Sequence, residues 1–322
     1  MKNAIATLLA AALTATGSLA STPSAAASAP EGLHVERFAS PNPGSVNTYL
    51  IQAPQGLILV DTLRTLTDAR NALARVQDTG QPIVAILLTH SHPDHVGGAG
   101  VFHDAFPWAP IYASTSTAKA MREDKRGFYD LQRSLPDADY PDQLTYPNRT
   151  FKPGTSVKIG GLTLQTADFI EGESDAAIVY YEARSRSLFT GDLVGNRVTP
   201  ALLEGHTCGW LVHLDRISTR FAGARRLYPG HGGPGTPGRL ITAQRAYLKD
   251  FRALVKPTVR AASKGGSRVT ATERRSIIAR MNRAYPNHPS VASLPTMMEE
   301  NVKAVAAELR TTKPAELPAA CR

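Results

Sequence analysis

The stretch THSHPDHVGG, residues 89–98, is the part of this sequence that says most about its fold. Three of the nine histidines, His90, His92 and His95, fall here together with Asp94, and a glycine pair follows. Imidazole and carboxylate groups are suitable ligands for zinc and similar divalent ions. A tight loop can point His90 and His92 at one centre, and Asp94 with His95 at a neighbouring centre. The stretch therefore predicts a large part of a two-metal site.

Two further motifs downstream offer the remaining ligands. Asp192 follows a strand-like run in SLFTGDLVG, and His231 follows another in LYPGHGGPG. Each is a ligand-capable residue at the end of a strand beside turn residues, where loops on a rigid scaffold usually carry function. One such motif can arise by chance, but three in this order favour a metal centre over a set of structural histidines.

The set HxHxDH with GG, then GD, then GH resembles the metallo-β-lactamase superfamily, from residue 32 to about residue 240. That resemblance implies an α/β fold, a four-layer αβ/βα sandwich, usually with two metal ions. By position it implies that the first metal is bound by His90 and His92, the second by Asp94, His95 and His231, and that Asp192 bridges the two.

One position departs from the family pattern. The family normally has a third histidine for the first metal, in a turn some twenty residues before the bridging aspartate. Here that turn reads EGESDAA, and Glu173 stands nineteen residues before Asp192. We interpret Glu173 as the replacement ligand. Two alternatives stay open: His206, which lies in a GHTCG motif after Asp192 and which we assign to the pocket rim, or a site with no third ligand.

The exchange of histidine for glutamate changes the charge of the expected site. Two divalent ions, two aspartates and one hydroxide sum to +1, and the glutamate of this chain brings the sum to zero. A less positive site is a weaker Lewis acid and acidifies bound water less. We expect two divalent ions, with zinc as the first choice and manganese or iron as alternatives.

The resemblance implies a hydrolase in which a metal-bridging hydroxide attacks a carbonyl carbon of a small-molecule substrate. Asp94 is the expected catalytic residue, because it can orient the hydroxide or pass its proton to the leaving group. The expected substrate is an ester, a lactone or a related acyl compound. The alternatives are a β-lactamase, although β-lactamases usually carry Cys or Ser where Asp192 stands, an iron-dependent redox enzyme, and a metal-binding protein without catalysis.

The N-terminus has the pattern of a secretory signal. Lys2, a short apolar run and small residues occupy residues 1–29, and both 18–20 and 27–29 fit the cleavage rule. The apolar run is well short of the roughly 20 residues that span a bilayer. We therefore expect export to the periplasm or the extracellular space and no membrane span. Cys208 and Cys321 are the only cysteines, and a disulfide and two free thiols are equally open.

Positive charge gathers in the C-terminal part of the chain. Residues 236–322 hold 16 Lys and Arg against 6 Asp and Glu, a net +10, so the remainder carries −1 of the total +9. The basic residues are spread along expected helices without interleaved aromatics, which favours solvated helix faces over a nucleic-acid or membrane surface. We expect no nucleic-acid partner, and the sequence leaves the oligomeric state open.

The patterns divide the chain into a signal (1–29), a catalytic domain (30–240) and a basic helical extension packed on it (241–322). The extension is expected to form helices over 239–255, 271–285 and 291–309. A polar, weakly periodic segment, 122–154, is expected near the pocket mouth with one short helix. Three aromatics, Tyr140, Tyr146 and Trp210, are candidate pocket residues, with core packing as the alternative for Trp210. Asp61 is a candidate to orient a ligand histidine or, equally, to cap a turn.

Overall fold

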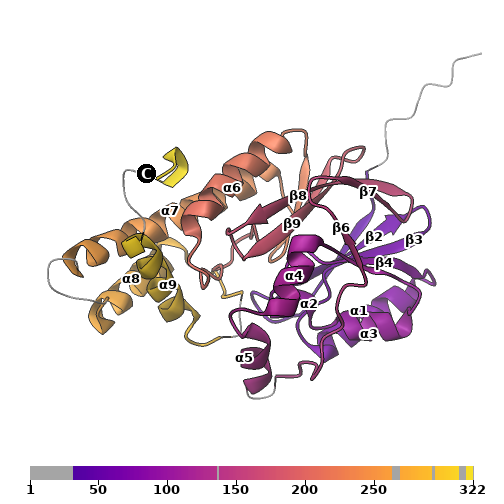
Figure 1. The fold of residues 1–322 in the computed structure, drawn as a ribbon, viewed down its shortest axis with the longest axis horizontal. Coiled ribbons are helices and arrows are strands. Elements are labelled where there is room, and N and C mark those ends of the chain that lie inside the picture. The colour runs from indigo at the N-terminus through magenta and orange to yellow at the C-terminus, as the bar shows by residue number, and fades with distance from the viewer. Residues whose placement is uncertain (1–31, 136–137, 263–268, 292–293, 312–316, 322) are drawn as a thin grey trace, which may run out of the picture. The chain divides into compact units, whose positions relative to one another are not determined.

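The computed structural model describes residues 32–135, 138–262, 269–291, 294–311 and 317–321. The expected signal, residues 1–29, lies outside the described residues. Two mixed β-sheets with helices on their outer faces make up the described chain (Figure 1). None of the helices in these ranges is long and apolar enough to cross a membrane.

The first sheet has six strands, arranged in chain order. Its first three strands are antiparallel, and the following three are parallel. The strands are β1 (Val35–Ala39), β2 (Asn47–Ala53), β3 (Gly56–Val60), β4 (Ile83–Leu87), β5 (Ile111–Ser114) and β6 (Arg149–Phe151). Parallel neighbours require crossovers, and α1 (Leu66–Asp78) and α3 (Ala99–Ala105) supply two of them.

The second sheet has five strands in the order β11-β10-β9-β8-β7. Only the β10–β11 pair is parallel among its neighbours. The strands are β7 (Ser156–Ile159), β8 (Leu162–Ile170), β9 (Ala176–Glu182), β10 (Ser187–Gly191) and β11 (Arg226–Pro229). The helix α6 (Thr207–Arg220) connects β10 to β11.

Side-chain alternation along the strands explains the four layers. In β3, Ile58 and Val60 face the second sheet, whereas Leu57 and Leu59 pack on the helical side. The inter-sheet core also contains Tyr180 of β9. Because successive residues of a strand point to opposite faces, a strand covered on both sides must be apolar throughout. The predicted four-layer sandwich is confirmed.

Helices complete the outer layers. The first sheet is covered by α1, α3 and α4 (Thr115–Glu123), and the short helices α2 (Pro93–Val96) and α5 (Phe128–Ser134) lie beside the strand ends. The second sheet shares a core with α6, α7 (Pro237–Ala262), α8 (Ala271–Ala284), α9 (Met297–Thr311) and the terminal turn η2 (Ala319–Cys321).

The expected domain boundaries remain predictions. The structure adds that α7 runs through residue 240, and that one core joins Trp210 of α6 to Phe251 of α7 and Val305 of α9. Cys208 and Cys321 form a disulfide that ties η2 to the start of α6. Of the two open interpretations of these cysteines, the disulfide is therefore confirmed.

Two of the helices expected in the C-terminal extension have wrong limits. The helix expected over 239–255 runs from Pro237 to Ala262 as α7. The helix expected over 291–309 begins only at Met297, because the chain before it pairs with another segment: the Val291 N–H donates to the Thr199 carbonyl at 3.2 Å. The helix expected within 122–154 is confirmed as α5.

Candidate metal centre

The HxHxDH residues lie in a loop between β4 and α3 that packs closely on its neighbours. Pro93 provides the first residue of α2, where its missing N–H costs nothing. A Cβ on Gly97 would lie 2.2 Å from the Arg64 carbonyl oxygen, and one on Gly98 would lie 2.1 Å from the Thr62 carbonyl oxygen. Only glycine fits at both positions, so the sequence fixes this loop against the segment that follows β3.

The structure brings four of the expected ligands into one buried group: His90, His92, Glu173 and Asp192, whose ligand atoms lie within 4.8 Å of one another. The His92 Nδ1 atom is 3.1 Å from Glu173 Oε1, and the His90 Nε2 atom is 3.5 Å from Glu173 Oε2. The turn before β9 thus places Glu173 beside both histidines. His206 is not in this group.

A second group contains Asp94, His95, Asp192 and His231. The His231 Nε2 atom lies 3.1 Å from Asp94 Oδ2 and 3.1 Å from Asp192 Oδ2. The His95 Nε2 atom lies 3.2 Å from Asp192 Oδ1. Asp192, at the end of β10, therefore belongs to both groups, in the place that the sequence predicted for a bridging carboxylate.

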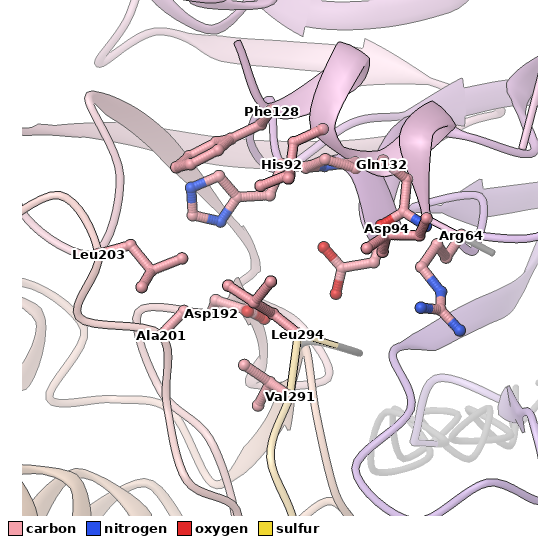
Figure 2. A pocket seen from close by; sticks show the side chains of 13 residues that line it. Arg64, His92, Asp94, Phe128, Gln132, Asp192, Ala201, Leu203, Val291 and Leu294 are labelled. Atoms are coloured by element: carbon pink, nitrogen blue, oxygen red, sulfur yellow. The ribbon is translucent and has the colours of Figure 1, made fainter. Parts of the chain in front are cut away.

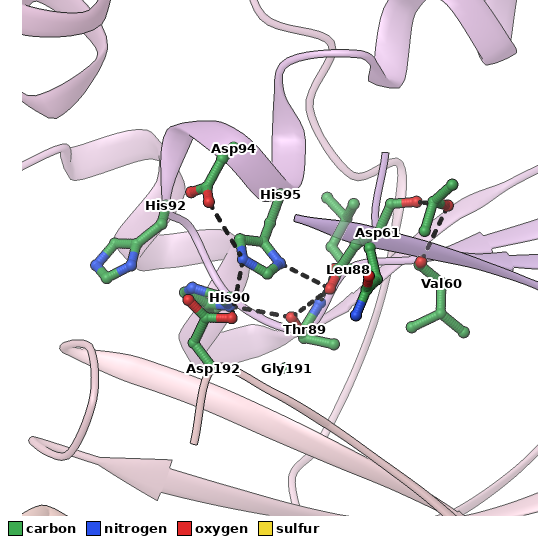
Figure 3. A network of polar contacts seen from close by, with 12 residues as sticks. Val60, Asp61, Leu88, Thr89, His90, His92, Asp94, His95, Gly191 and Asp192 are labelled. Carbon is green, nitrogen blue, oxygen red and sulfur yellow. Dashed lines mark hydrogen bonds and ion pairs between the residues drawn. The ribbon is translucent and has the colours of Figure 1, made fainter. Parts of the chain in front are cut away.

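Asp61 orients two of the histidines (Figure 3). The His95 Nδ1–H donates to Asp61 Oδ2 at 2.8 Å, and the Thr89 hydroxyl donates to the same oxygen at 2.8 Å. Because that hydroxyl has already donated its proton, Thr89 Oγ1 accepts from His90 Nδ1–H at 3.0 Å. The Nε2 atoms of His90 and His95 thereby face the two groups, toward Glu173 and Asp192. Of the two open interpretations of Asp61, the structure bears out the orienting one.

The other two histidines are oriented in the same manner. The His92 Nε2–H donates to Glu204 Oε1 at 3.0 Å, so its Nδ1 atom faces Glu173. The His231 Nδ1–H donates to the Gly44 carbonyl at 2.7 Å, so its Nε2 atom faces the second group. Metal-binding histidines characteristically donate their other N–H to a carboxylate or carbonyl.

Several inward-facing atoms make no well-aligned hydrogen bond among the described residues and lie only at ion-pair distances from one another. They are buried, and they include His90 Nε2, His95 Nε2, His231 Nε2, Asp192 Oδ1 and both carboxylate oxygens of Glu173. Buried polar atoms are nearly always satisfied, so a cluster of unsatisfied nitrogens and oxygens needs a partner that protein atoms do not supply. Divalent ions fit this donor set.

Neighbouring charges shift the pKa values of the buried groups of the site. Burial alone would lower the pKa of the His231 imidazole, but Asp192 and Asp94 raise it to about 10. Burial alone would raise the pKa of the Asp94 carboxyl, but His95 and His231 hold it below its usual range. Asp94 is therefore an ionised carboxylate.

A third acidic group lies behind His92. It contains Asp175, Glu204 and His206. The Arg126 guanidinium occupies the position that a cation would take, with its Nη2 atom 3.5 Å from Asp175 Oδ1, 3.5 Å from His206 Nε2 and 3.3 Å from the Glu204 carbonyl oxygen. This group therefore supports Glu204 and needs no metal of its own. His206 was expected at the pocket rim; its side chain lies in this group, 3.6 Å from Asp175 Oδ1, and does not line the cleft described below.

A cleft opens directly on the two groups (Figure 2). Its wall contains His92, Asp94 and Asp192, and most of the remaining lining is apolar. The lining residues are Arg64, Pro93, Phe128, Leu131, Gln132, Leu135, Ala201, Leu203, Val291 and Leu294, together with the three above. The prediction that segment 122–154 borders the pocket is borne out by α5.

The aromatics expected in the pocket lie elsewhere. Tyr140 packs against Gly97, Tyr146 is an exposed residue beside Arg122, and Trp210 is a core residue whose indole N–H donates to the Leu193 carbonyl at 2.8 Å. None of the three lines this cleft, but Trp210 also lines a separate small cavity that contains Glu173, Asp192 and His231 in its wall.

Sequence reasoning missed several residues of the site, and they include Arg64, Glu204, Val291 and Leu294. Glu204 stands in the LLEGHT run, two residues before His206. In the sequence, the GHT motif marks His206 as the ligand-capable residue of this run, and nothing marks Glu204. No local pattern marks Val291 or Leu294, since the segment 291–309 reads as one helix. Only tertiary packing brings them to the cleft.

Residues 41–256 match the family model described as the metallo-β-lactamase superfamily. The chain belongs to this superfamily. The predicted family is therefore confirmed.

Curated relatives within the superfamily include hydrolases of different substrates. The linear primary-alkylsulfatase of Pseudomonas sp. (strain ATCC 19151) is 26% identical over 257 residues, which cover 67% of this chain and 47% of that protein. The probable metallo-hydrolase YybB of Bacillus subtilis (strain 168) is 32% identical over 160 residues, covering 46% of this chain and 61% of that protein. The chain thus spans about half the length of these two relatives.

Solved superfamily structures share the fold. A β-lactamase domain protein from Burkholderia ambifaria superposes with a TM-score of 0.63 at 18% identity, covering 86% of each chain. A metallo-β-lactamase family protein from Thermus thermophilus gives a TM-score of 0.60 at 22% identity, covering 85% of this chain and 91% of that chain.

Proposed function

We propose that this chain is an exported, metal-dependent hydrolase that cleaves an ester, a lactone or a related acyl bond in a substrate with an apolar chain. One observation carries the proposal: a largely apolar cleft has Asp94, His92 and Asp192 of the two ligand groups in its wall. Apolar pockets with a few convergent polar groups are the usual form of small-molecule sites. A substrate chain in this cleft places its scissile bond at the ligand groups.

The ligand assignment is part of the proposal. Two divalent ions, zinc first and manganese or iron as alternatives, supply a Lewis acid and lower the pKa of water when bound. The first ion is held by His90, His92 and Glu173, and the second by Asp94, His95 and His231, with Asp192 shared.

Asp94 is the proposed catalytic residue. Its carboxylate lines the cleft and lies 3.1 Å from His231 Nε2, and its depressed pKa keeps it ionised. An ionised carboxylate can accept a hydrogen bond from the attacking water and hold it toward the substrate carbonyl. It can then take a proton from that water as the new carbon–oxygen bond forms, and give the proton to the departing oxygen as its bond to the carbonyl carbon breaks.

Export rests on the signal-like residues 1–29 and on the Cys208–Cys321 disulfide. Disulfides persist in oxidising compartments and are rare in the cytosol. Periplasmic or extracellular action is therefore part of the proposal, and proteomics of cell fractions is its test: full-length protein confined to the cytosol would contradict it.

A sulfate ester is the second candidate substrate. It is favoured by the alkylsulfatase relative, whose alignment covers two thirds of this chain, and by the apolar cleft, which suits an alkyl group. The alternatives of a β-lactamase, an iron redox enzyme and a metal-binding protein without turnover are outcomes of the same experiment.

The test is a substrate panel with defined metal loading. Zinc-loaded protein is assayed with p-nitrophenyl octanoate, p-nitrophenyl acetate, an acyl lactone, octyl sulfate and a cephalosporin. We expect turnover of the octanoate ester above the acetate, loss on chelation and recovery with zinc. Turnover supported by zinc shows that the measured reaction is not redox chemistry, because zinc does not change its oxidation state. Turnover of octyl sulfate alone selects the second candidate. Lack of turnover of every substrate contradicts the proposal.

A further inference from the structure

Arg64 contributes a cationic side chain to the cleft that the proposed mechanism does not use. It lines the apolar cleft and also an adjoining smaller cavity, and both of these contain Asp94 in their walls. Its side chain is half-buried and forms no hydrogen bond or ion pair with any of the described residues. Asp94 lies in both walls, and Asp68 lines the smaller cavity as well. The Asp94 carboxylate points away from the Arg64 guanidinium (Figure 2) and lies 3.1 Å from His231 Nε2.

The backbone holds Arg64 firmly in this place. Asp61 and Leu63 adopt left-handed conformations, with φ of 59° and 69°, which non-glycine residues seldom adopt. The segment is hydrogen-bonded to the metal loop, because the Thr62 N–H donates to the His95 carbonyl at 2.9 Å and the Gly98 N–H donates to the Leu63 carbonyl at 2.9 Å. Strained backbone that its surroundings hold in place is typical of functional sites.

A half-buried guanidinium is only partly solvated, so an anionic ligand in the cleft gains more from pairing with it than it would at a fully exposed arginine. Its planar donors match the oxygens of a carboxylate or a sulfate, often in a bidentate geometry. We propose that Arg64 binds an anionic group of the substrate, so that the substrates of this enzyme are anionic esters with an apolar chain. This inference rests on the proposed function and narrows it to a substrate class.

The cleft offers complementary surfaces for such a molecule. Arg64 lies in the wall that also holds Pro93 and Asp94, whereas Leu203, Val291 and Leu294 provide apolar wall from two other segments. With its anionic group at Arg64, the substrate can place its apolar chain along the rest of the cleft. The alternative that Arg64 is a solvated surface charge predicts no difference between anionic and neutral substrates.

Matched ester pairs test the inference. The pairs are p-nitrophenyl butyrate with mono-p-nitrophenyl succinate, and p-nitrophenyl hexanoate with mono-p-nitrophenyl adipate, which differ only in a terminal carboxylate. For Arg64→Gln we expect kcat/KM to fall about tenfold or more for the anionic member and less than about twofold for the neutral member. Arg64→Lys should recover part of the preference. Arg70→Gln, on the exposed side of α1, is the matched control and should change neither.

A binding measurement separates this inference from the proposed function. Metal-loaded wild type and Arg64→Gln are titrated calorimetrically with octanoate and with octyl sulfate. Weaker binding of either anion by the variant supports the inference even where no ester is hydrolysed, and the tighter of the two identifies carboxylate or sulfate as the preferred group. Unchanged binding together with an unchanged ratio of kcat/KM between anionic and neutral esters overturns it.

Discussion

The Glu173 carboxylate lies against both histidines of the first ligand group, with Oε1 3.1 Å from His92 Nδ1 and Oε2 3.5 Å from His90 Nε2. We predict that Glu173→Ala lowers the metal content from two ions per chain toward one, because its removal leaves two histidines and a shared aspartate. Glu173→His should restore two ions and favour zinc over manganese, since imidazole is the softer ligand.

Metal analysis of purified protein checks this prediction. Glu171→Gln, which removes a neighbouring exposed carboxylate, is the control and should keep two ions. Two ions in Glu173→Ala would exclude Glu173 as a ligand.

Glu204 should set the metal affinity of the first group through His92. Its Oε1 atom accepts the Nε2–H of His92 at 3.0 Å, and Arg126 holds the carboxylate in place from 3.6 Å. Loss of such an outer hydrogen bond typically costs about 10–100-fold in metal affinity. We predict that Glu204→Ala binds one of its two ions with an affinity lower by this factor. Competition with a chromophoric chelator measures the affinity.

His206→Gln provides the comparison for Glu204, because His206 belongs to the same polar group but does not contact His92. It should retain both affinities within about threefold, well inside the effect expected for loss of an outer ligand partner. If both variants lose metal affinity to the same extent, the hydrogen bond from His92 to Glu204 is not the cause, and the packing of the whole Asp175–Glu204–His206 group is.

Asp61 should matter for stability even without metal. Its carboxylate accepts from the Thr89 N–H, the Thr89 hydroxyl and His95 Nδ1–H. Asp61→Ala leaves these buried donors unpaired and is expected to lower the free energy of unfolding by about 3 kcal/mol. Urea denaturation in chelator measures this loss separately from metal binding.

Asp61→Asn keeps the left-handed backbone conformation, which asparagine tolerates, and one acceptor oxygen. We therefore expect Asp61→Asn to lower the free energy of unfolding by less than Asp61→Ala does. If Asp61→Ala unfolds at the same urea concentration as wild type, the proposed structural role is wrong.

The disulfide should stabilise the attachment of the C-terminus. It joins residues 113 positions apart, and removing a bridge over a loop of this size typically costs about 2–5 kcal/mol. We expect the double variant Cys208→Ser, Cys321→Ser to unfold at lower temperature and to keep its metal content. Reductant should lower the unfolding temperature of wild type and leave the double variant unchanged; a wild type insensitive to reductant would contradict the prediction.

Local sequence determined much of the fold and most of the site. Alternating and continuous apolar runs identified the strands, because strands buried on both faces must be apolar throughout. The motifs around His90, Asp192 and His231 identified ligand-capable residues, because metal ligands and the glycines beside them are chemically distinctive. Glu173 was found by its spacing from Asp192 in a family pattern.

Tertiary structure alone decided what surrounds those ligands. Glu204 reaches His92 across 112 positions of sequence, and Val291 reaches the cleft from the segment before α9. Arg64 is an ordinary basic residue in the sequence, and the role proposed for it rests on a backbone that places it in the same cavity walls as Asp94. Residue type and spacing in the sequence predict which residues can bind metal. The orientation of these side chains, the shape of the cleft and its charge depend on contacts between residues far apart in the sequence, which no local pattern predicts.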